Sequence, residues 1–227
     1  MLKGKGLLTP LQQEFLAVFS RIPDQKRFYL TGGTALAEYY LGHRLSFDLD
    51  LFTSDAELVL PVSFEVQDLC SKSSLGVNVS RRFSSYVEFV LIRGEESVKV
   101  DLALDSPFRF APPIESETGV LVNDLQDLKI DKLLAYYGRA EPRDAVDLYL
   151  IFQESPVDEL LNLAKRKDPG FDIYWFAIAL NRADNFPDEI VQWPVKMLQS
   201  VSALDIKRSF HDLALELMGK LTANGTN

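Results

Sequence analysis

The chain has 227 residues, of which 47% are hydrophobic and 25% are charged, as is ordinary for a globular protein with one large domain or a core and a smaller appended domain. The net charge of −9 argues against a protein that coats nucleic acid nonspecifically, because such binding relies on many phosphate contacts. No apolar run is long enough to span a bilayer and no signal peptide is apparent, so we expect a cytoplasmic protein with no membrane partner.

The predicted elements begin with a helix and a short strand. Thr9 can cap the helix, with Gln12 completing a capping box three residues later. Its apolar residues recur at helical spacing and should pack on the core. The strand runs from Phe28 to Leu30 and stops at the glycine pair Gly32-Gly33.

A second helix and a second strand follow the glycine pair. Thr34 can cap a helix from Ala35 to Leu41, and Gly42 suits its C-cap. The stretch from Phe47 to Phe52 alternates, which predicts a strand with Phe47 on one face together with the leucines and with the aspartates on the other.

Two carboxylates, Asp48 and Asp50, should point from the other face of this strand toward the same side. They repel each other unless a cation lies between them, and a divalent ion such as Mg²⁺ or Mn²⁺ favours carboxylate and phosphate oxygens. Backbone amides at Gly32-Gly33 and the following helix start can approach a phosphate. One short unit therefore offers two carboxylates for a metal ion and a glycine turn for phosphate. Each half alone also fits an ordinary solvated strand face or turn.

The order of these motifs resembles a known family. Gly32-Gly33 followed by Asp48-Leu-Asp50 resembles the signature of nucleotidyltransferases of the DNA polymerase beta type. The fuller string, Gly-Gly-Thr-Ala-Leu and then His43-Arg44-x-Ser46-x-Asp48-x-Asp50-Leu-Phe52, is similar to the AbiEii/AbiGii toxin family. The matching residues lie between Phe28 and Phe152, just over half of the chain. Members of this family are toxins of bacterial abortive-infection and toxin–antitoxin pairs.

A loop, a helix and three strands are predicted next, at Thr53–Leu60, Pro61–Ser71, Val77–Phe83, Tyr86–Ile92 and Ser97–Leu104. The helix should carry the single Cys70 inward as a buried free thiol, and one cysteine excludes an internal disulfide. The last two strands are separated by a polar turn, which favours an antiparallel hairpin.

Asp101 shares one face of the last strand with Lys99 and Ala103. In the resembled fold a third acidic residue comes from a neighbouring strand after a hairpin, and Asp101 matches that place. Simple alternation on an exposed sheet face would account for the same residue without a function.

The second half is predicted to be mostly helical, after a loop at Pro107–Ser116 and a short strand at Gly119–Val122. The helices are expected from Asn123 or Asp124 to Tyr137 with Gly138 as the stop, from Glu141 through Tyr149, at Pro156–Lys167, at Phe171–Ala183 and at Ser202–Leu221, before a frayed tail at Thr222–Asn227.

Lys132 lies in the first of these helices, and Arg143-Asp144-x-x-Asp147-Leu opens the second. The combination resembles the fourth motif of the same toxin family. The resemblance implies that Lys132 holds nucleotide phosphates, that Asp147 positions this lysine or the incoming hydroxyl, and that Arg143 and Asp144 support the cluster. An ordinary salt bridge between helices is the alternative.

The sequence predicts an α+β fold with a nucleotidyltransferase core at 1–110, in which helices flank a mixed sheet, and a mostly helical domain at 111–227 that completes the cleft. The resemblance implies a nucleotidyltransferase that moves a nucleoside monophosphate from a nucleoside triphosphate to an acceptor hydroxyl and releases pyrophosphate. The residues expected to bind the metal are Asp48, Asp50 and Asp101, and those expected to contact the nucleotide are Gly32, Gly33, Thr34, Arg44, Ser46, Lys132 and Arg143.

The toxin resemblance implies RNA as the acceptor, in particular the 3′ end of tRNA, and a cognate antitoxin as a partner. A small-molecule or protein acceptor is the alternative for an enzyme, and a nucleotide-binding module without turnover is the alternative from another class. The sequence leaves open the preferred nucleoside triphosphate and the oligomeric state.

Overall fold

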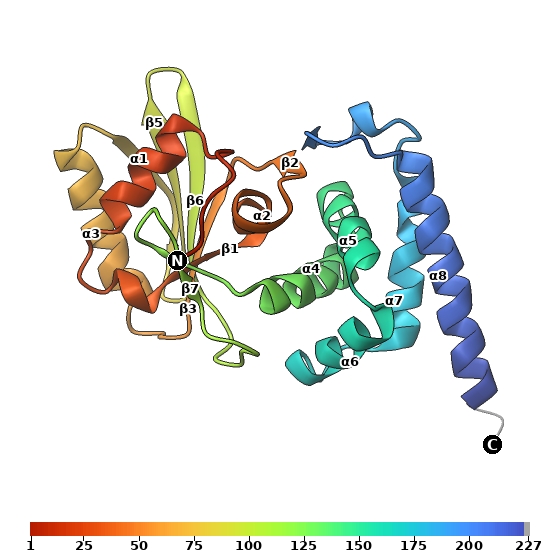
Figure 1. The fold of residues 1–227 in the computed structure, drawn as a ribbon. Helices are drawn as coiled ribbons and strands as arrows, with labels where there is room; N and C mark the ends of the chain where they lie inside the picture. Colours follow the sequence, from red (N-terminus) through yellow and green to blue (C-terminus); the bar gives the residue numbers. More distant parts are fainter. Residues whose placement is uncertain (225–227) are drawn as a thin grey trace. The chain divides into compact units, whose positions relative to one another are not determined.

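A computed structural model describes residues 1–224 of the chain (Figure 1). The chain divides into two units, Met1–Leu128 and the residues from Lys129 onward, and each is described by itself. The first unit is a mixed sheet with helices and the second is helical, which confirms the α+β class. The division falls at residue 128, whereas the sequence placed an inner boundary near residue 110.

The first unit is built on a sheet with the strand order β4-β5-β6-β3-β1-β8-β7. Its strands are β1 (Tyr29–Thr31), β3 (Leu49–Thr53), β4 (Gly76–Phe83), β5 (Tyr86–Arg93), β6 (Glu96–Leu104), β7 (Ile114–Glu115) and β8 (Leu121–Val122). The predicted hairpin of β5 and β6 is confirmed, and β4 pairs antiparallel with the outer side of β5. At the centre, β3 runs parallel to β6 and antiparallel to β1.

One face of this sheet is apolar and covered by α1 (Pro10–Phe19) and α3 (Val59–Lys72), which lie on the same side in Figure 1. Alternate residues of three adjacent strands, such as Leu51, Leu102 and Val87, are fully buried there. The period of two along each strand therefore supplies a core on one face and leaves the other face for polar groups.

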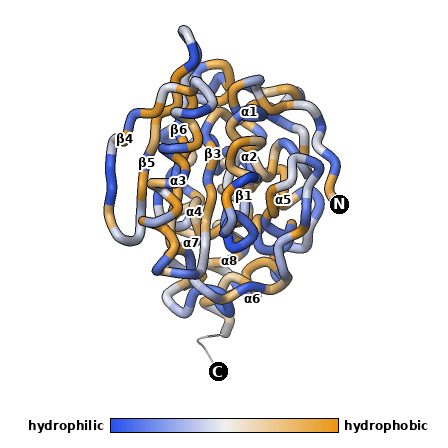
Figure 2. Tube along the Cα trace, turned by 90° about the vertical axis from the view of Figure 1, so that its left-hand side faces the viewer, coloured by the Kyte–Doolittle hydropathy of each residue, from blue (hydrophilic) through white to orange (hydrophobic). Residues whose placement is uncertain are grey.

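The two helices on this face largely match the sequence. Thr9 and Gln12 form the predicted capping box, with both reciprocal hydrogen bonds present. Cys70 is a buried free thiol on α3, as expected, and burial raises its pKa to about 11. At the sheet's edge, Figure 2 shows β4 in more hydrophilic colours than its neighbour β5.

The glycine turn differs from its prediction. The helix α2 (Gly32–Ala35) starts at the glycines after Thr31, so Thr34 lies inside the helix and does not cap it. The helix continues as a π-helical turn, η2 (Leu36–Leu41). It ends at Gly42 with φ +67°, which confirms the predicted C-cap.

The strand predicted at 47–52 is displaced. A two-residue strand, β2 (Arg44–Leu45), precedes it, and β3 begins only at Leu49, so Asp48 lies just before the strand. The Thr34 hydroxyl donates a hydrogen bond to the Asp48 carbonyl, so the partner of this carbonyl is a side chain of α2. Phe47 is half exposed rather than part of the core, whereas Leu49 is fully buried.

Other differences in the first unit are smaller. The helix α3 begins two residues earlier than expected, and the strand predicted at 119–122 is confined to β8. The stretch expected to be a loop before it contributes β7, which pairs antiparallel with β8.

A short 3₁₀ turn, η1 (Gln25–Arg27), completes the first unit. The second unit, which α4 enters from Leu125, contains α4 (Leu125–Arg139), α5 (Pro142–Glu154), α6 (Val157–Lys167), α7 (Ile173–Leu180), η3 (Asn181–Asn185), η4 (Ile190–Gln192), β9 (Lys196–Met197) and α8 (Ala203–Asn224).

Several predicted helix ends in this unit differ from the structure, and α7 ends at Leu180, three residues before the predicted Ala183. Gly138 lies inside α4, and the helix ends one residue later because Ala140 takes a left-handed conformation with φ +47°. The predicted frayed tail is helical from 222 to 224, and its last part, 225–227, lies outside the described residues. Within the described residues, no helix is both long enough and apolar enough to cross a membrane.

Candidate active site

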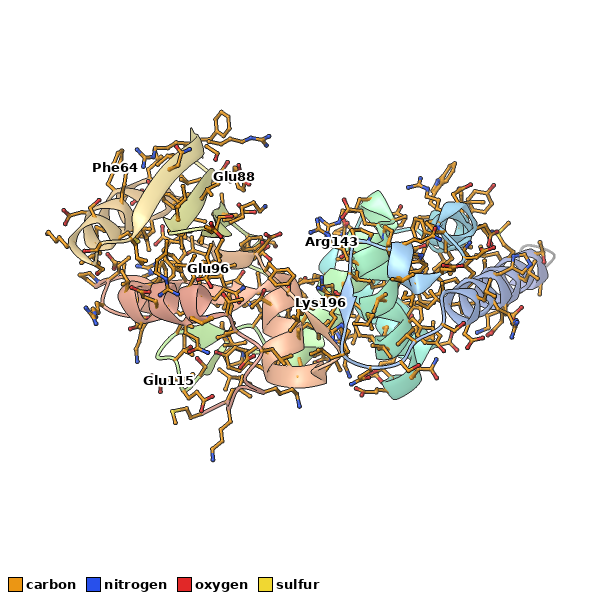
Figure 3. All side chains as sticks on the ribbon, turned by 90° about the horizontal axis from the view of Figure 1, so that it is seen from above. Phe64, Glu88, Glu96, Glu115, Arg143 and Lys196 are labelled. Carbon is orange, nitrogen blue, oxygen red and sulfur yellow. The ribbon has the colours of Figure 1, made fainter. Side chains whose placement is uncertain are left out.

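Acidic side chains line up across adjacent strands on the polar face of the sheet. Asp50 on β3 is the register partner of Asp101 on the parallel strand β6, and Asp101 is in turn opposite Glu88 on β5. Register partners on neighbouring strands project to the same face about 4.8 Å apart along the hydrogen-bonding direction. The structure therefore brings Asp101 beside Asp50, and Figure 3 shows Glu88 on the side of the sheet opposite Phe64 of α3.

Both carboxylate oxygens of Asp101 are engaged. Oδ2 accepts a hydrogen bond from Lys99 Nζ at 2.8 Å, and Oδ1 accepts one from the Tyr86 hydroxyl at 3.0 Å. The same hydroxyl lies 3.1 Å from Glu88 Oε2. Burial, followed by the charge and hydrogen bond of Asp101, raises the pKa of Tyr86, so the phenol stays protonated as a donor.

Three aspartates raise the pKa of Lys99. Burial by itself would lower the pKa of Lys99, but the hydrogen bond and charge of Asp101, and then the charges of Asp48 and Asp50, outweigh it and raise the pKa. Asp48 therefore lies close enough to Lys99 to act on it, although it precedes strand β3. The Lys99 ammonium is thus a cation held against Asp101 within the acidic group.

The glycine turn is packed against these residues. Gly32 has φ +70°, and a Cβ atom placed on it would lie 2.0 Å from Asp50 Oδ2. A Cβ atom on Gly33 would lie 2.6 Å from a terminal nitrogen of Arg44 and 2.9 Å from Ser46 Oγ. Only glycine permits this approach, so the turn, the carboxylate and the cationic Arg44 form one compact group.

Buried hydrogen bonds fix the backbone of the turn. Thr34, which is 2% exposed, donates to the Asp48 carbonyl. Thr31, which is the register partner of Asp50, accepts a hydrogen bond of 3.0 Å from the side-chain amide of Asn123. Arg109 donates to the Asn123 side-chain oxygen at 2.6 Å. The end of β1 is therefore fixed by the Asn123 side chain, and the helix start after it is fixed by the backbone at Asp48.

A second group of charged residues is buried within the helical unit. Lys132 Nζ on α4 lies 2.8 Å from Asp147 Oδ2 and 3.4 Å from Asp144 Oδ1, both on α5. Arg139 Nε lies 2.6 Å from Asp144 Oδ2. The structure thus brings together the predicted lysine and both aspartates, which are fully buried.

Arg143, which the resemblance assigned to the same cluster, lies in the first turn of α5. Its Nε donates to Glu141 Oε2 at 2.8 Å, and its side chain is 41% exposed (Figure 3). Arg139, a residue that the sequence did not assign to the cluster, also donates to Asp144 Oδ1 at 3.0 Å. Arg139 lies in the last turn of α4, five residues before Asp144, and sequence spacing along one helix could not reveal a contact across the bend at Ala140.

Lys99, Tyr86 and Glu88 are residues of the site that the sequence did not identify as functional. Lys99 could have been found, because it lies two positions before Asp101 and shares its strand face. Tyr86 and Glu88 required the register of β5 against β6, which a sequence pattern alone does not provide.

The chemistry of the acidic group fits a hard divalent cation, because carboxylate oxygens are the ligands such ions favour and the space at Gly32 admits Asp50 to the turn. As the side chains stand, no group of three or more His, Cys, Asp or Glu residues within 1–224 is arranged to hold a metal ion. In this arrangement the cation in contact with Asp101 is the Lys99 ammonium.

Known proteins resemble this chain in sequence and in fold. The sequence profile of the family described as nucleotidyl transferase AbiEii toxin, type IV TA system, matches residues 14–209. No curated protein matches significantly.

Three solved structures have a similar fold. MenT4, a nucleotidyltransferase toxin from Mycobacterium tuberculosis H37Rv, aligns with a TM-score of 0.58 and 19% identity, over 91% of this chain and 81% of that one. A putative nucleotidyltransferase from Helicobacter pylori aligns with a TM-score of 0.55 and 19% identity, over 95% and 98% of the two chains. JHP933 from Helicobacter pylori aligns with a TM-score of 0.53 and 18% identity, over 95% and 92%.

The three structural likenesses describe the fold, and the family assignment rests on the sequence profile, which spans well over half of the chain and includes the glycine turn, all three aspartates and the Lys132 cluster. The chain belongs to the AbiEii family of nucleotidyltransferase toxins.

Proposed function

We propose that this nucleotidyltransferase is a metal-dependent toxin that moves a nucleoside monophosphate from a nucleoside triphosphate to the 3′ end of an RNA, in particular tRNA. The observation that carries the proposal is the register of Asp50 and Asp101 beside the turn at Gly32. A cognate antitoxin is the expected protein partner, since the matched family is described as a type IV toxin–antitoxin system.

Asp48, Asp50 and Asp101 would hold Mg²⁺ or Mn²⁺, which when bound neutralises charge on the triphosphate and on the pyrophosphate that leaves. The backbone amides at Gly32 and Gly33, at the start of the helix, bind phosphate oxygens.

Further residues of the first unit orient the reactants. Arg44 and Ser46, which lie against Gly33, extend the phosphate-binding surface with a cation and a hydroxyl. Thr34 keeps the backbone at Asp48 in place through its hydrogen bond to that carbonyl. Asp101 lowers the cost of deprotonating the attacking hydroxyl.

The proposal also assigns a part in the reaction to the helical unit. Lys132 is a compact cation suited to phosphate, and Asp147 and Asp144 fix its position. Arg143, partly exposed, is the further cation assigned to the nucleotide. Conservative variants test this assignment: Lys132→Arg should keep the charge and the fold but lose most of the transfer, since a guanidinium does not replace an ammonium as a point charge.

The direct experiment incubates the purified protein with each α-labelled nucleoside triphosphate, Mg²⁺ and total cellular RNA. We expect one nucleotide to label one RNA size class, and periodate oxidation of the RNA beforehand to remove the label by destroying the 3′ diol. Asp50→Ala should abolish transfer while the protein stays folded. Asp68→Ala is the matched control, because Asp68 is an exposed carboxylate on α3 that pairs with Lys72.

The outcomes separate the alternatives. Label on protein or on a small metabolite would contradict the RNA acceptor and leave a nucleotidyltransferase with another substrate. Nucleotide binding without release of pyrophosphate, with every acceptor fraction, would indicate a binding module. Full activity of a purified Asp50→Ala variant would contradict the metal assignment.

A further inference from the structure

Lys99 is a cation built into the acidic site. It lies two residues before Asp101 on β6 and on the same face, and its ammonium donates to Asp101 Oδ2 at 2.8 Å. The charges of Asp48 and Asp50 act on the same ammonium. Its side chain is 38% exposed whereas that of Asp101 is 11% exposed, so the lysine can leave while the carboxylate stays.

The two contacts of Asp101 respond differently to an arriving metal ion. An ionised carboxylate has several lone pairs, so the neutral Tyr86 hydroxyl on Oδ1 can remain while another ligand binds. The Lys99 ammonium cannot share Asp101 with a divalent cation in this way, because two positive charges at contact distance repel strongly in a partly desolvated site. The ion and Lys99 therefore compete for Asp101.

We propose that Lys99 is an internal counter-ion that pairs with Asp101 in the absence of metal, offsets one negative charge of the acidic group, and is displaced from Asp101 when a divalent cation binds. This inference rests on the proposed function for the identity of the metal-binding residues. Its consequence is that the nucleotide-free enzyme binds the metal ion weakly. The phosphates of a nucleotide then favour replacement of Lys99 by the ion, because they attract the released ammonium as well as the ion.

The test measures Mn²⁺ binding to the nucleotide-free protein by the electron paramagnetic resonance signal of the free ion. Lys99→Met should bind Mn²⁺ about tenfold or more tightly than the unaltered protein, because the competing charge is gone. Lys99→Arg keeps the charge and should bind no more tightly than the unaltered protein. Lys72→Met removes an exposed lysine of α3 and should change nothing.

A double variant locates the site. Lys99→Met combined with Asp101→Asn should lose the gained affinity, because the carboxylate exposed by removal of Lys99 is then absent. Retention of tight binding in the double variant would place the ion elsewhere and overturn the proposal. Lys99→Gln, which keeps a hydrogen-bond donor at the same position, replaces Lys99→Met if far-UV circular dichroism shows that the latter does not fold.

Two results separate this inference from the proposed function. Unchanged or weaker Mn²⁺ binding by Lys99→Met and Lys99→Gln, including binding undetectable in every protein, overturns the counter-ion, whatever the transfer assay shows. Absence of transfer by the unaltered protein with every nucleotide and acceptor, together with tighter Mn²⁺ binding by Lys99→Met, overturns the proposed reaction and leaves the counter-ion in place.

Discussion

Substitution of Gly32 by alanine isolates the contact on which the site depends. Two costs should add: the left-handed backbone at φ +70°, and a Cβ atom that would lie 2.0 Å from Asp50 Oδ2. The first costs about 1–2 kcal/mol for a residue with a side chain. The second forces Asp50 off its rotamer, at a further cost of about 0.5–1.5 kcal/mol. The carboxylate is thereby moved away from the position that the proposed reaction requires.

Two other glycines provide matched controls. Gly94, in the turn between β5 and β6, has φ +61° with nothing near the added Cβ, so Gly94→Ala carries only the backbone cost. Gly138 lies within α4 with open space around it, and Gly138→Ala should stabilise the protein by about 0.5–1 kcal/mol. The difference between Gly32→Ala and Gly94→Ala measures the contact with Asp50.

Calorimetric melting and the labelled-RNA assay measure both effects. For a chain of this size, each kcal/mol lowers Tm by about 2–4 °C, so Gly32→Ala should melt below Gly94→Ala by about 1–6 °C. Transfer by Gly32→Ala should fall about 100-fold, as expected for a misplaced reacting group, while Gly94→Ala stays near the normal rate. If Gly32→Ala melts with Gly94→Ala and transfers nucleotide normally, Asp50 does not pack against the glycine turn and the described site is wrong.

Three further predictions address other parts of the chain. Lys132→Met removes the ammonium between the buried Asp144 and Asp147 and should lower the free energy of unfolding by about 3 kcal/mol in urea titrations; a loss below experimental error would contradict the buried charge cluster. Glu38→Gln weakens a buried carboxylate that accepts three backbone N–H groups of the N-terminal segment and should cost about 1–3 kcal/mol, with faster amide exchange in that segment as the check. Burial raises the pKa of Cys70 from near 9 to about 11, so at pH 8 its thiolate is about 100-fold scarcer than in the unfolded chain and should react correspondingly slowly with a disulfide reagent; rapid modification of the native protein would refute its burial.

The sequence predicted the parts of the fold that depend on local patterns. The sequence pattern identified β5 and β6 as strands, and the polar turn between them identified the hairpin. The capping box at Thr9 and the helix end at Gly42 could be predicted because both motifs require particular residue types at fixed positions. The capping box requires Thr9 and Gln12, and the left-handed C-cap favours a glycine. The same patterns, joined in order, indicated the family.

The errors arose where tertiary contacts override local preference. Thr34 has the chemistry of a helix cap, yet its hydroxyl is used by the Asp48 carbonyl and the helix starts earlier at the glycines. Phe47 fits the apolar period of a strand, but the chain joins the sheet only at Leu49 and leaves this ring half exposed. Neither outcome can be decided without knowing which distant segment packs alongside.

The missed residue Lys99 shows how the core and the site depend on each other. On β6 the buried leucine and valines of the apolar face alternate with Lys99 and Asp101. The pairing of β3 with β6 that places Leu51 beside Leu102 also places Asp50 beside Asp101. A slip of one residue between β3 and β6 would move the carboxylate into the apolar layer, so the register that is most stable is also the one that assembles the charged group. The hydrophobic core therefore fixes the carboxylates side by side on the sheet, where a nearby cation relieves their repulsion. In the proposal above, a lysine on the same strand relieves part of that repulsion without metal, and its partly exposed side chain can give way to an ion when substrate arrives.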